Sequence, residues 1–195
     1  MNDVLRSVAR FISPRMLPRA AYPVIVGSLR GARFVLGTLA GEGGGASVYF
    51  NAVEPRQTSA LINTLKSGQT FFDIGANVDY YTILGSRLVG KEGSVIAFEP
   101  VPKNLFHLYQ YITINKADNV IIMPAACAHT LSVSTFSSGL NYAMGHLTSR
   151  EDNHGNRVRI GSSIVSTVTL DEVVRRFGVA PDVVKKDVKG AEAWC

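Results

Sequence analysis

Short apolar runs alternate with helical patterns along most of the chain after residue 55. Four runs bounded by turn residues are typical of buried strands, and they cover Thr70–Ile74, Ser94–Phe98, Val120–Met123 and Asp182–Asp187. Apolar residues at helical spacing predict helices over Gln57–Leu65, over Tyr80–Leu88 and around Leu105, Leu108 and Ile112. Strand and helix in alternation at this spacing predict an α/β fold, with parallel strands joined by crossover helices.

The flanking segments carry weaker patterns. Val4–Ile12 has apolar residues at helical spacing, and Tyr22–Leu36 has the composition of a β-hairpin. Further strands are predicted over Ser132–Phe136 and Ser163–Val168, followed by a short helix that starts at Thr169-Leu170-Asp171 and runs to Phe177. We therefore expect an N-terminal extension over residues 1–50, made of a basic helix and a hairpin, and one α/β domain over residues 51–195.

Composition and charge narrow the class of protein. A chain of 195 residues with 46% hydrophobic and 18% charged residues fits one compact domain. Residues 1–41 hold six arginines and one aspartate, so the net charge of +5 lies there and the rest is balanced. This balance disfavours nucleic acid as a partner. The sequence shows no membrane span or signal-peptide core, so we expect a cytoplasmic protein.

The basic N-terminal helix has two interpretations. Its short pattern favours a helix that packs on the domain or on a partner subunit. The alternative is peripheral contact with an anionic membrane surface, because Arg6 and Arg10 lie on a face apart from the apolar residues.

The stretch Phe71–Asp79 carries the main chemical signal. An apolar strand ends in Asp73, Gly75 permits a tight turn, and a helix starts shortly afterwards. A second strand ends in Glu99, whose carboxylate can accept hydrogen bonds from the hydroxyls of a ribose. The N–H groups of the helix start suit an anionic group of a ligand. These features predict a crevice for a nucleoside-containing cofactor.

The turn also indicates which cofactor. A dinucleotide site needs G-x-G-x-x-G, but here Gly75 is followed by Asn77 and Asp79, and a second anion at residue 79 would oppose a diphosphate. No phosphate-binding G-x-x-x-x-G-K-[ST] loop occurs either. S-adenosylmethionine has a ribose, a zwitterionic tail and no phosphate, so it fits better. A dinucleotide or nucleotide-sugar enzyme is the disfavoured alternative.

Four segments together resemble the FkbM family of S-adenosylmethionine-dependent methyltransferases. They are Phe72–Thr82, Ala97–Asn104, Thr169–Asp171 and Lys186–Glu192. The resemblance implies a Rossmann-like class I methyltransferase sheet, mostly parallel with helices on both faces. It also implies methylation of a hydroxyl group on a sugar, polyketide or related small metabolite.

The resemblance assigns roles to particular residues. The cofactor-binding set that it implies has Asp73, Gly75 and Asn77 at the methionine end, Glu99 at the ribose, and Asn104 and Ala126 nearer the adenosine. Ala76 and Pro100 complete the set. Asp187 would face the acceptor as the catalytic residue. We expect no metal, because His146, Asp152 and His154 stand in a polar segment without a fixed ligand spacing.

The chain departs from the family pattern at several positions. Asp79 replaces a glycine, and we expect it to act as a helix N-cap. Lys186 and Lys189 replace an apolar and an acidic residue, and a lysine here would seek solvent or a carboxylate and favour ionised Asp187. The residues present correspond to the cofactor-binding half plus a fourth strand, so the sheet is expected to be incomplete on its C-terminal side.

Two expectations follow from this incomplete sheet. Its outer edge would need cover from a loop, from the hairpin or from a second copy of the chain, which makes a homo-oligomer one prediction. The alternative to an active methyltransferase is a cofactor-binding remnant that acts as an interaction or regulatory subunit.

Overall fold

The computed structural model describes residues 18, 20–36, 46–78, 80–137, 146–148 and 163–188. The helix predicted over residues 4–12 lies outside these residues, as do Asp79 and Lys189. No helix in the described ranges is long and apolar enough to cross a membrane. The boundary predicted at residue 50 stays a prediction.

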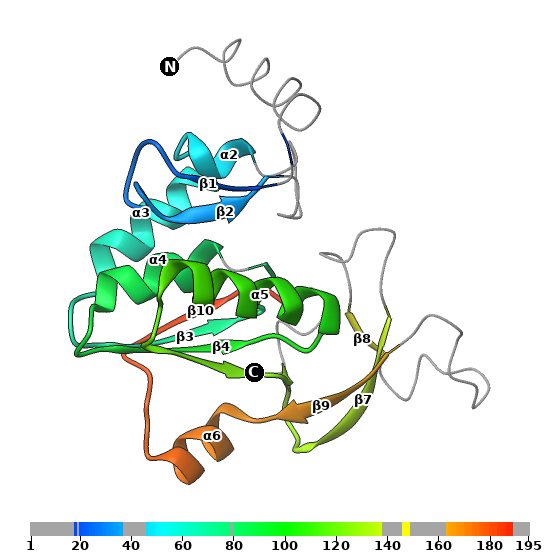
Figure 1. The fold of residues 1–195 in the computed structure, drawn as a ribbon. Helices are drawn as coiled ribbons and strands as arrows, with labels where there is room; N and C mark the ends of the chain where they lie inside the picture. Colours follow the sequence, from blue (N-terminus) through cyan, green and yellow to red (C-terminus); the bar gives the residue numbers. More distant parts are fainter. Residues whose placement is uncertain are drawn as a thin grey trace.

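The centre of the fold is a four-stranded parallel sheet in the order β10-β3-β4-β5 (Figure 1). Its strands are β3 (Thr70–Ile74), β4 (Ser94–Phe98), β5 (Val120–Met123) and β10 (Val183–Lys186). The α/β class predicted from the alternating pattern is confirmed. Strand β10 is an edge strand of the described sheet. That a second copy of the chain covers this edge stays a prediction.

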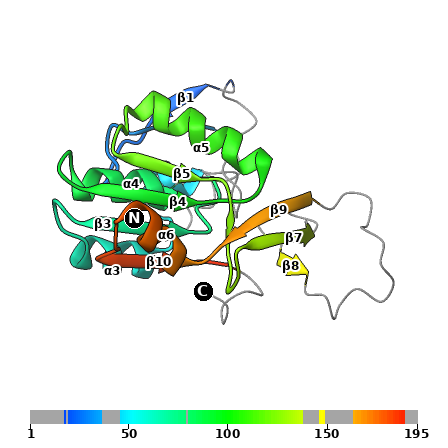
Figure 2. The same cartoon turned by 90° about the horizontal axis from the view of Figure 1, so that it is seen from below.

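Helices cover both faces of this sheet (Figures 1 and 2). Helices α4 (Tyr80–Val89) and α5 (Pro102–Asn115) lie on one face, and α6 (Leu170–Phe177) lies on the other. Helix α3 (Pro55–Thr64) packs against α4. The predicted helices are therefore present, with ends that differ by a few residues.

Side chains alternate along β3 and fill both layers of the core. Phe71 packs with the α4 and α5 side, whereas Phe72 and Ile74 join the cluster that contains Val173 of α6. A Cβ at Gly85 would overlap the Phe71 ring, so this mid-helix glycine lets α4 approach the strand closely. Asp73 falls on the α4 side of β3, where its hydroxyl partner Thr82 also lies.

Further strands build a second sheet rather than widening the first. Its order is β6-β9-β7-β8, and the strands are β6 (Ala126–Cys127), β7 (Ser132–Ser137), β8 (His146–Thr148) and β9 (Ser163–Val168). Strands β7 and β9 were predicted, but β6 and β8 were not. Since β6 follows β5 after two residues, this sheet departs from the carboxyl edge of the parallel sheet.

The N-terminal hairpin packs on the helical layer. Strands β1 (Ala21–Pro23) and β2 (Arg33–Val35) pair antiparallel, as predicted, and a short helix α2 (Ala46–Tyr49) follows that was not predicted. Phe34 of β2 is fully buried and its ring lies 5.2 Å from that of Tyr111 in α5. In Figure 1 the hairpin lies on the side of α4 and α5 that faces away from the sheet.

Candidate functional site

The turn between β3 and α4 brings two strand ends together. Gly75 has a φ of 74°, and a Cβ at this position would overlap the backbone carbonyl oxygen of Asp187. The N–H groups of Gly75 and Ala76 both donate to the carbonyl oxygen of Phe98, at 3.0 Å each. Glycine is therefore required both for the left-handed conformation and for the close approach of the segment after β10.

Asn77 continues the turn toward Glu99. It has a φ of 53°, a conformation that asparagine tolerates better than most residues, and its N–H donates to Glu99 Oε2 at 2.8 Å. The N–H groups of residues 75–77 are thus all engaged within the protein. The sequence predicted that an anionic group would meet the N–H groups of the helix start, and this stays a prediction because residues 75–77 precede that helix.

Glu99 is 3% exposed and is held by three donors. Its Oε1 accepts from the Val101 N–H at 2.8 Å and from Asn104 Nδ2 at 3.2 Å, while Oε2 accepts from the Asn77 N–H and from no other donor in the described part of the chain. Burial raises the pKa of Glu99, and these hydrogen bonds oppose the rise. A carboxylate offers about four lone-pair sites, so Oε2 keeps room for one more donor such as a hydroxyl.

Asp73 is fully buried beside a lysine. Its Oδ2 accepts from Thr82 Oγ1 at 2.7 Å, and its Oδ1 lies 3.2 Å from Lys185 Nζ. Lys185 is opposite Asp73 in the β10–β3 register, and its side chain is 9% exposed. Its ammonium also lies 3.9 Å from Asp187 Oδ2, and the Asp187 side chain is 52% exposed. One cation therefore stands between a buried and an exposed carboxylate.

Tyr81 completes the surroundings of this lysine. Lys185 Nζ lies 4.9 Å from the centre of the Tyr81 ring and 3.4 Å from the Gly75 carbonyl oxygen. The Tyr81 hydroxyl donates to Glu54 Oε2 at 2.7 Å, which fixes the ring. Burial is the main cause of a raised pKa for Tyr81.

One buried acceptor at the turn is unsatisfied by the protein. Asn77 Oδ1 is buried and has no hydrogen-bond partner among the described residues. Such an atom costs free energy unless a ligand or water donates to it. It belongs to the residue whose N–H donates to Glu99 Oε2. A ligand that donated to both acceptors, Asn77 Oδ1 and Glu99 Oε2, would carry hydroxyl or ammonium groups. A ribose with an amino-acid tail carries both, so the residues present fit S-adenosylmethionine.

The other predicted residues fall around the same strand ends. Ala76 and Ala126 are buried, and Pro100 is half-buried. Asn104 is buried as well, and it supports Glu99 through its amide. The structure thus gathers Asp73, Glu99 and Asp187 near one turn, whereas their predicted contacts with a cofactor stay predictions.

Sequence reasoning missed Lys185. It pointed to Lys186 and Lys189 because they depart from a family pattern, but the lysine that reaches both carboxylates is Lys185. A signal was available, since residues 185 and 187 are two apart at the end of one strand and such residues share a face. The strand pairing that places Lys185 opposite Asp73 was not readable from the sequence.

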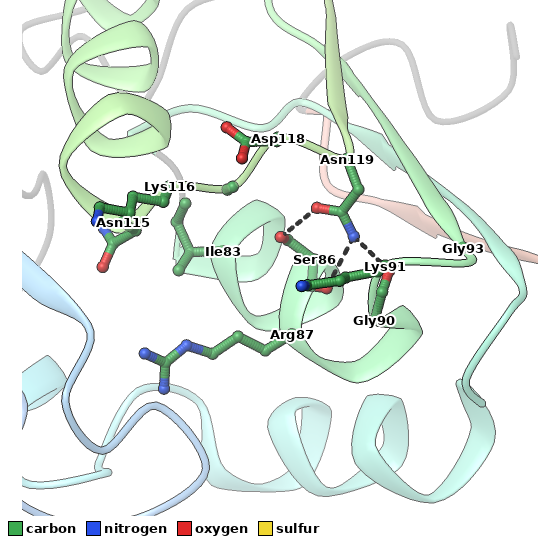
Figure 3. Close-up of a pocket in the computed structure, with 11 residues that line it drawn as sticks. Ile83, Ser86, Arg87, Gly90, Lys91, Gly93, Asn115, Lys116, Asp118 and Asn119 are labelled. Atoms are coloured by element: carbon green, nitrogen blue, oxygen red, sulfur yellow. Dashed lines mark hydrogen bonds between the residues drawn. The ribbon is translucent and has the colours of Figure 1, made fainter.

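A cavity of about 600 Å³ lies at the other end of the sheet (Figure 3). Its lining includes Gly93 and Asn119, which directly precede β4 and β5. Figure 3 shows Arg87 and Lys91 extending toward the side where Asn115 and Lys116 lie. Positive side chains are stabilised at helix C-termini. The basic residues that line this cavity are therefore explained by their positions at the C-terminal ends of α4 and α5. The cavity is not the predicted crevice, which lies at the carboxyl ends of the strands.

Comparison with known proteins supports the resemblance seen in the sequence. The family model "Methyltransferase FkbM domain" matches residues 73–194. No curated protein matches the chain.

Several solved structures are similar to a part of this chain. A protein from Clostridium thermocellum described as a "putative rRNA-methylase" is 22% identical, with a TM-score of 0.36 over 37% of this chain and 39% of that one. An S-adenosylmethionine-dependent methyltransferase from Aquifex aeolicus is 22% identical, with a TM-score of 0.33 over 37% and 38% of the two chains. Fibrillarin from Aeropyrum pernix, with natively bound S-adenosylmethionine, is 14% identical, with a TM-score of 0.32 over 37% and 32%. The aligned part therefore spans less than two fifths of each of these proteins.

Proposed function

The chain belongs to the FkbM methyltransferase family, and we propose that it transfers the methyl group of S-adenosylmethionine to a hydroxyl group of a small metabolite. A sugar or a polyketide is the acceptor class that the family resemblance suggests. The observation that carries the proposal is the buried carboxylate of Glu99 beside the Gly75 turn, with a remaining acceptor position on Oε2 and an unsatisfied Oδ1 on Asn77, the residue whose N–H donates to it.

Four residues of the chain would hold the cofactor. Glu99 would accept a hydrogen bond from a ribose hydroxyl, and Asn104 keeps its carboxylate in place through Oε1. Asn77 Oδ1 would accept from a donor of the ligand, which removes the cost of leaving it unsatisfied. Asp73 would provide a negative charge near the amino-acid end. The bound cofactor would supply a methyl group on a positively charged sulfur, which is an electrophile.

Asp187 would act on the acceptor. Its half-exposed carboxylate stands at the end of β10, beside the Gly75 turn, and can reach a molecule in solvent. It would accept a hydrogen bond from the acceptor hydroxyl and take its proton as the hydroxyl oxygen bonds to the methyl carbon. The electron pair of the broken carbon–sulfur bond would stay on sulfur. Alignment of the two reactants would supply the rest of the rate enhancement.

Binding and turnover can be tested separately. Calorimetry with S-adenosylhomocysteine should show binding by the wild-type chain and by Asp187→Asn. Transfer of tritiated methyl to a panel of hydroxylated metabolites should occur with the wild type and fall by about a hundredfold or more in Asp187→Asn. Asp118→Asn is the control, because Asp118 is an exposed acid at the far cavity and should keep full turnover.

The outcomes separate the candidate functions. Binding of S-adenosylhomocysteine without turnover on any acceptor would favour a cofactor-binding subunit without activity. Absence of binding would contradict the proposal as a whole. Equal turnover by Asp187→Asn and the wild type would remove Asp187 from the catalytic role.

A further inference from the structure

Lys185 occupies a site built to recognise an ammonium group. A carboxylate oxygen (Asp73 Oδ1, 3.2 Å), a backbone carbonyl oxygen (Gly75, 3.4 Å) and an aromatic ring (Tyr81, 4.9 Å to its centre) surround its Nζ. Anions, carbonyl dipoles and ring faces all attract cations. These three groups come from β3, from the turn after it and from α4, and none of them belongs to the lysine's own strand β10.

The fit between Lys185 and this site is loose. Asp73 Oδ1 is without a hydrogen bond among the described residues although the ammonium is within ion-pair distance. The bond to the Gly75 carbonyl oxygen is long for an N–H···O contact. A lysine side chain is flexible, and Asp187, at 3.9 Å and half-exposed, offers Lys185 a second anionic partner nearer solvent.

We propose that Lys185 holds, in the free protein, the place of the α-ammonium group of S-adenosylmethionine, and that binding of the cofactor moves Lys185 toward Asp187. This inference rests on the proposed function. Two cations at one buried carboxylate would repel each other, so the ligand's ammonium and Lys185 exclude each other from Asp73. The exchange moves Lys185, which lies 3.9 Å from Asp187 Oδ2 in the free protein, closer to this acceptor-side carboxylate when the methyl donor is bound.

Competition of this kind lowers the apparent affinity for the ligand. If Lys185 fills the site nine times in ten, the apparent dissociation constant rises about tenfold over that of the open site. Removal of the lysine also leaves Asp73 buried without its counter-ion, a state that a ligand's ammonium would relieve. Lys185→Met should therefore bind S-adenosylhomocysteine about tenfold more tightly than the wild type, although the free variant is less stable.

A pair of ligands isolates the ammonium. S-adenosylhomocysteine carries the α-ammonium group, whereas 5′-methylthioadenosine lacks the amino-acid part and should bind Lys185→Met and the wild type alike, within twofold. Lys186→Met removes the same charge from the next position of β10 and should leave both affinities unchanged. Unchanged or weaker binding of S-adenosylhomocysteine by Lys185→Met would overturn the inference, as would an equal gain for both ligands. If neither ligand binds any variant, the proposed function fails as well.

A measurement on the wild-type chain avoids any folding defect of the variant. Lys185 is almost buried in the free protein, so an amine-acylating reagent should label it slowly, as read by mass spectrometry. S-adenosylhomocysteine should increase this labelling several-fold and 5′-methylthioadenosine should not. Protection of Lys185 by S-adenosylhomocysteine would show that the lysine stays in place, and the inference would be wrong.

Discussion

Glu99 shows how one side chain both orders the candidate site and limits it. Its carboxylate accepts from two backbone N–H groups, of Asn77 and Val101, and from the amide of Asn104. These bonds join the turn after β3 to the start of α5 and hold both next to the end of β4. The same bonds leave one acceptor position on Oε2, so a ligand can donate a hydrogen bond to Glu99 without breaking the bonds that Glu99 makes within the protein.

Glu99→Gln should destabilise the fold. Both carboxylate oxygens accept N–H donors, so a glutamine must turn its own NH₂ donor against one of them. We expect a loss of about 1–3 kcal/mol in the free energy of unfolding, which is the cost of an unsatisfied buried donor. Urea unfolding measures it, with Glu92→Gln as the control because Glu92 is exposed. A loss no larger than that of Glu92→Gln would contradict the expectation.

The pH dependence of this effect has a defined sign. The pKa of Glu99 is raised above its ordinary value of 4.5, mainly by burial, so the folded state binds the proton more tightly than the unfolded state. The stability due to this proton is present below the ordinary value and is lost as the pH rises through the folded pKa. The advantage of the wild type over Glu99→Gln should therefore shrink over that interval. A constant difference between the two would contradict it.

At the scale of elements, local patterns predicted the strands better than their partners. Strands β3, β4, β5 and β9 have the bounds that the apolar runs predict, because turn residues delimit each run. The placement of β9 beside β6 and β7 depends on pairing between segments far apart in the chain. For the same reason Gly75 and Glu99 could be picked from the sequence, whereas the position of Lys185 opposite Asp73 could not.

Helix α6 offers an element-scale test, since its start was predicted at Thr169-Leu170-Asp171. Thr169 Oγ1 accepts from the Glu172 N–H at 3.0 Å, which is an N-cap hydrogen bond. Thr169→Ala should lower the free energy of unfolding by about 1 kcal/mol. Thr169→Ser should lower it much less, because the hydroxyl that accepts the cap hydrogen bond remains. Thermal or urea unfolding of the three proteins checks this. Equal losses in both variants would show that the methyl group, not the cap, matters.

At the scale of the whole molecule, side chains of α5 close the free edge of the N-terminal hairpin. Asn115 accepts from the Arg33 N–H at 2.7 Å and donates to the Arg33 carbonyl oxygen at 2.9 Å. The Tyr111 hydroxyl makes the equivalent pair of contacts with the backbone of Val35, at 3.1 and 3.3 Å. These side chains satisfy backbone groups of β2 that a third strand would otherwise pair. The hairpin is thereby attached to the helical layer through backbone groups as well as through Phe34.

Asn115→Ala should loosen the hairpin without unfolding the parallel sheet. The variant loses both bonds to Arg33, so we expect the free energy of unfolding to fall by about 1–2 kcal/mol. Amide hydrogen exchange should quicken first at Arg33, while the amides of β3 and β4 stay protected. Gln110→Ala, at an exposed position of the same helix, is the matched control. If the Arg33 amide kept its protection while stability fell, Asn115 would act through its other bond, to the Tyr111 carbonyl oxygen within α5, and its bonds to Arg33 would not be what holds the hairpin.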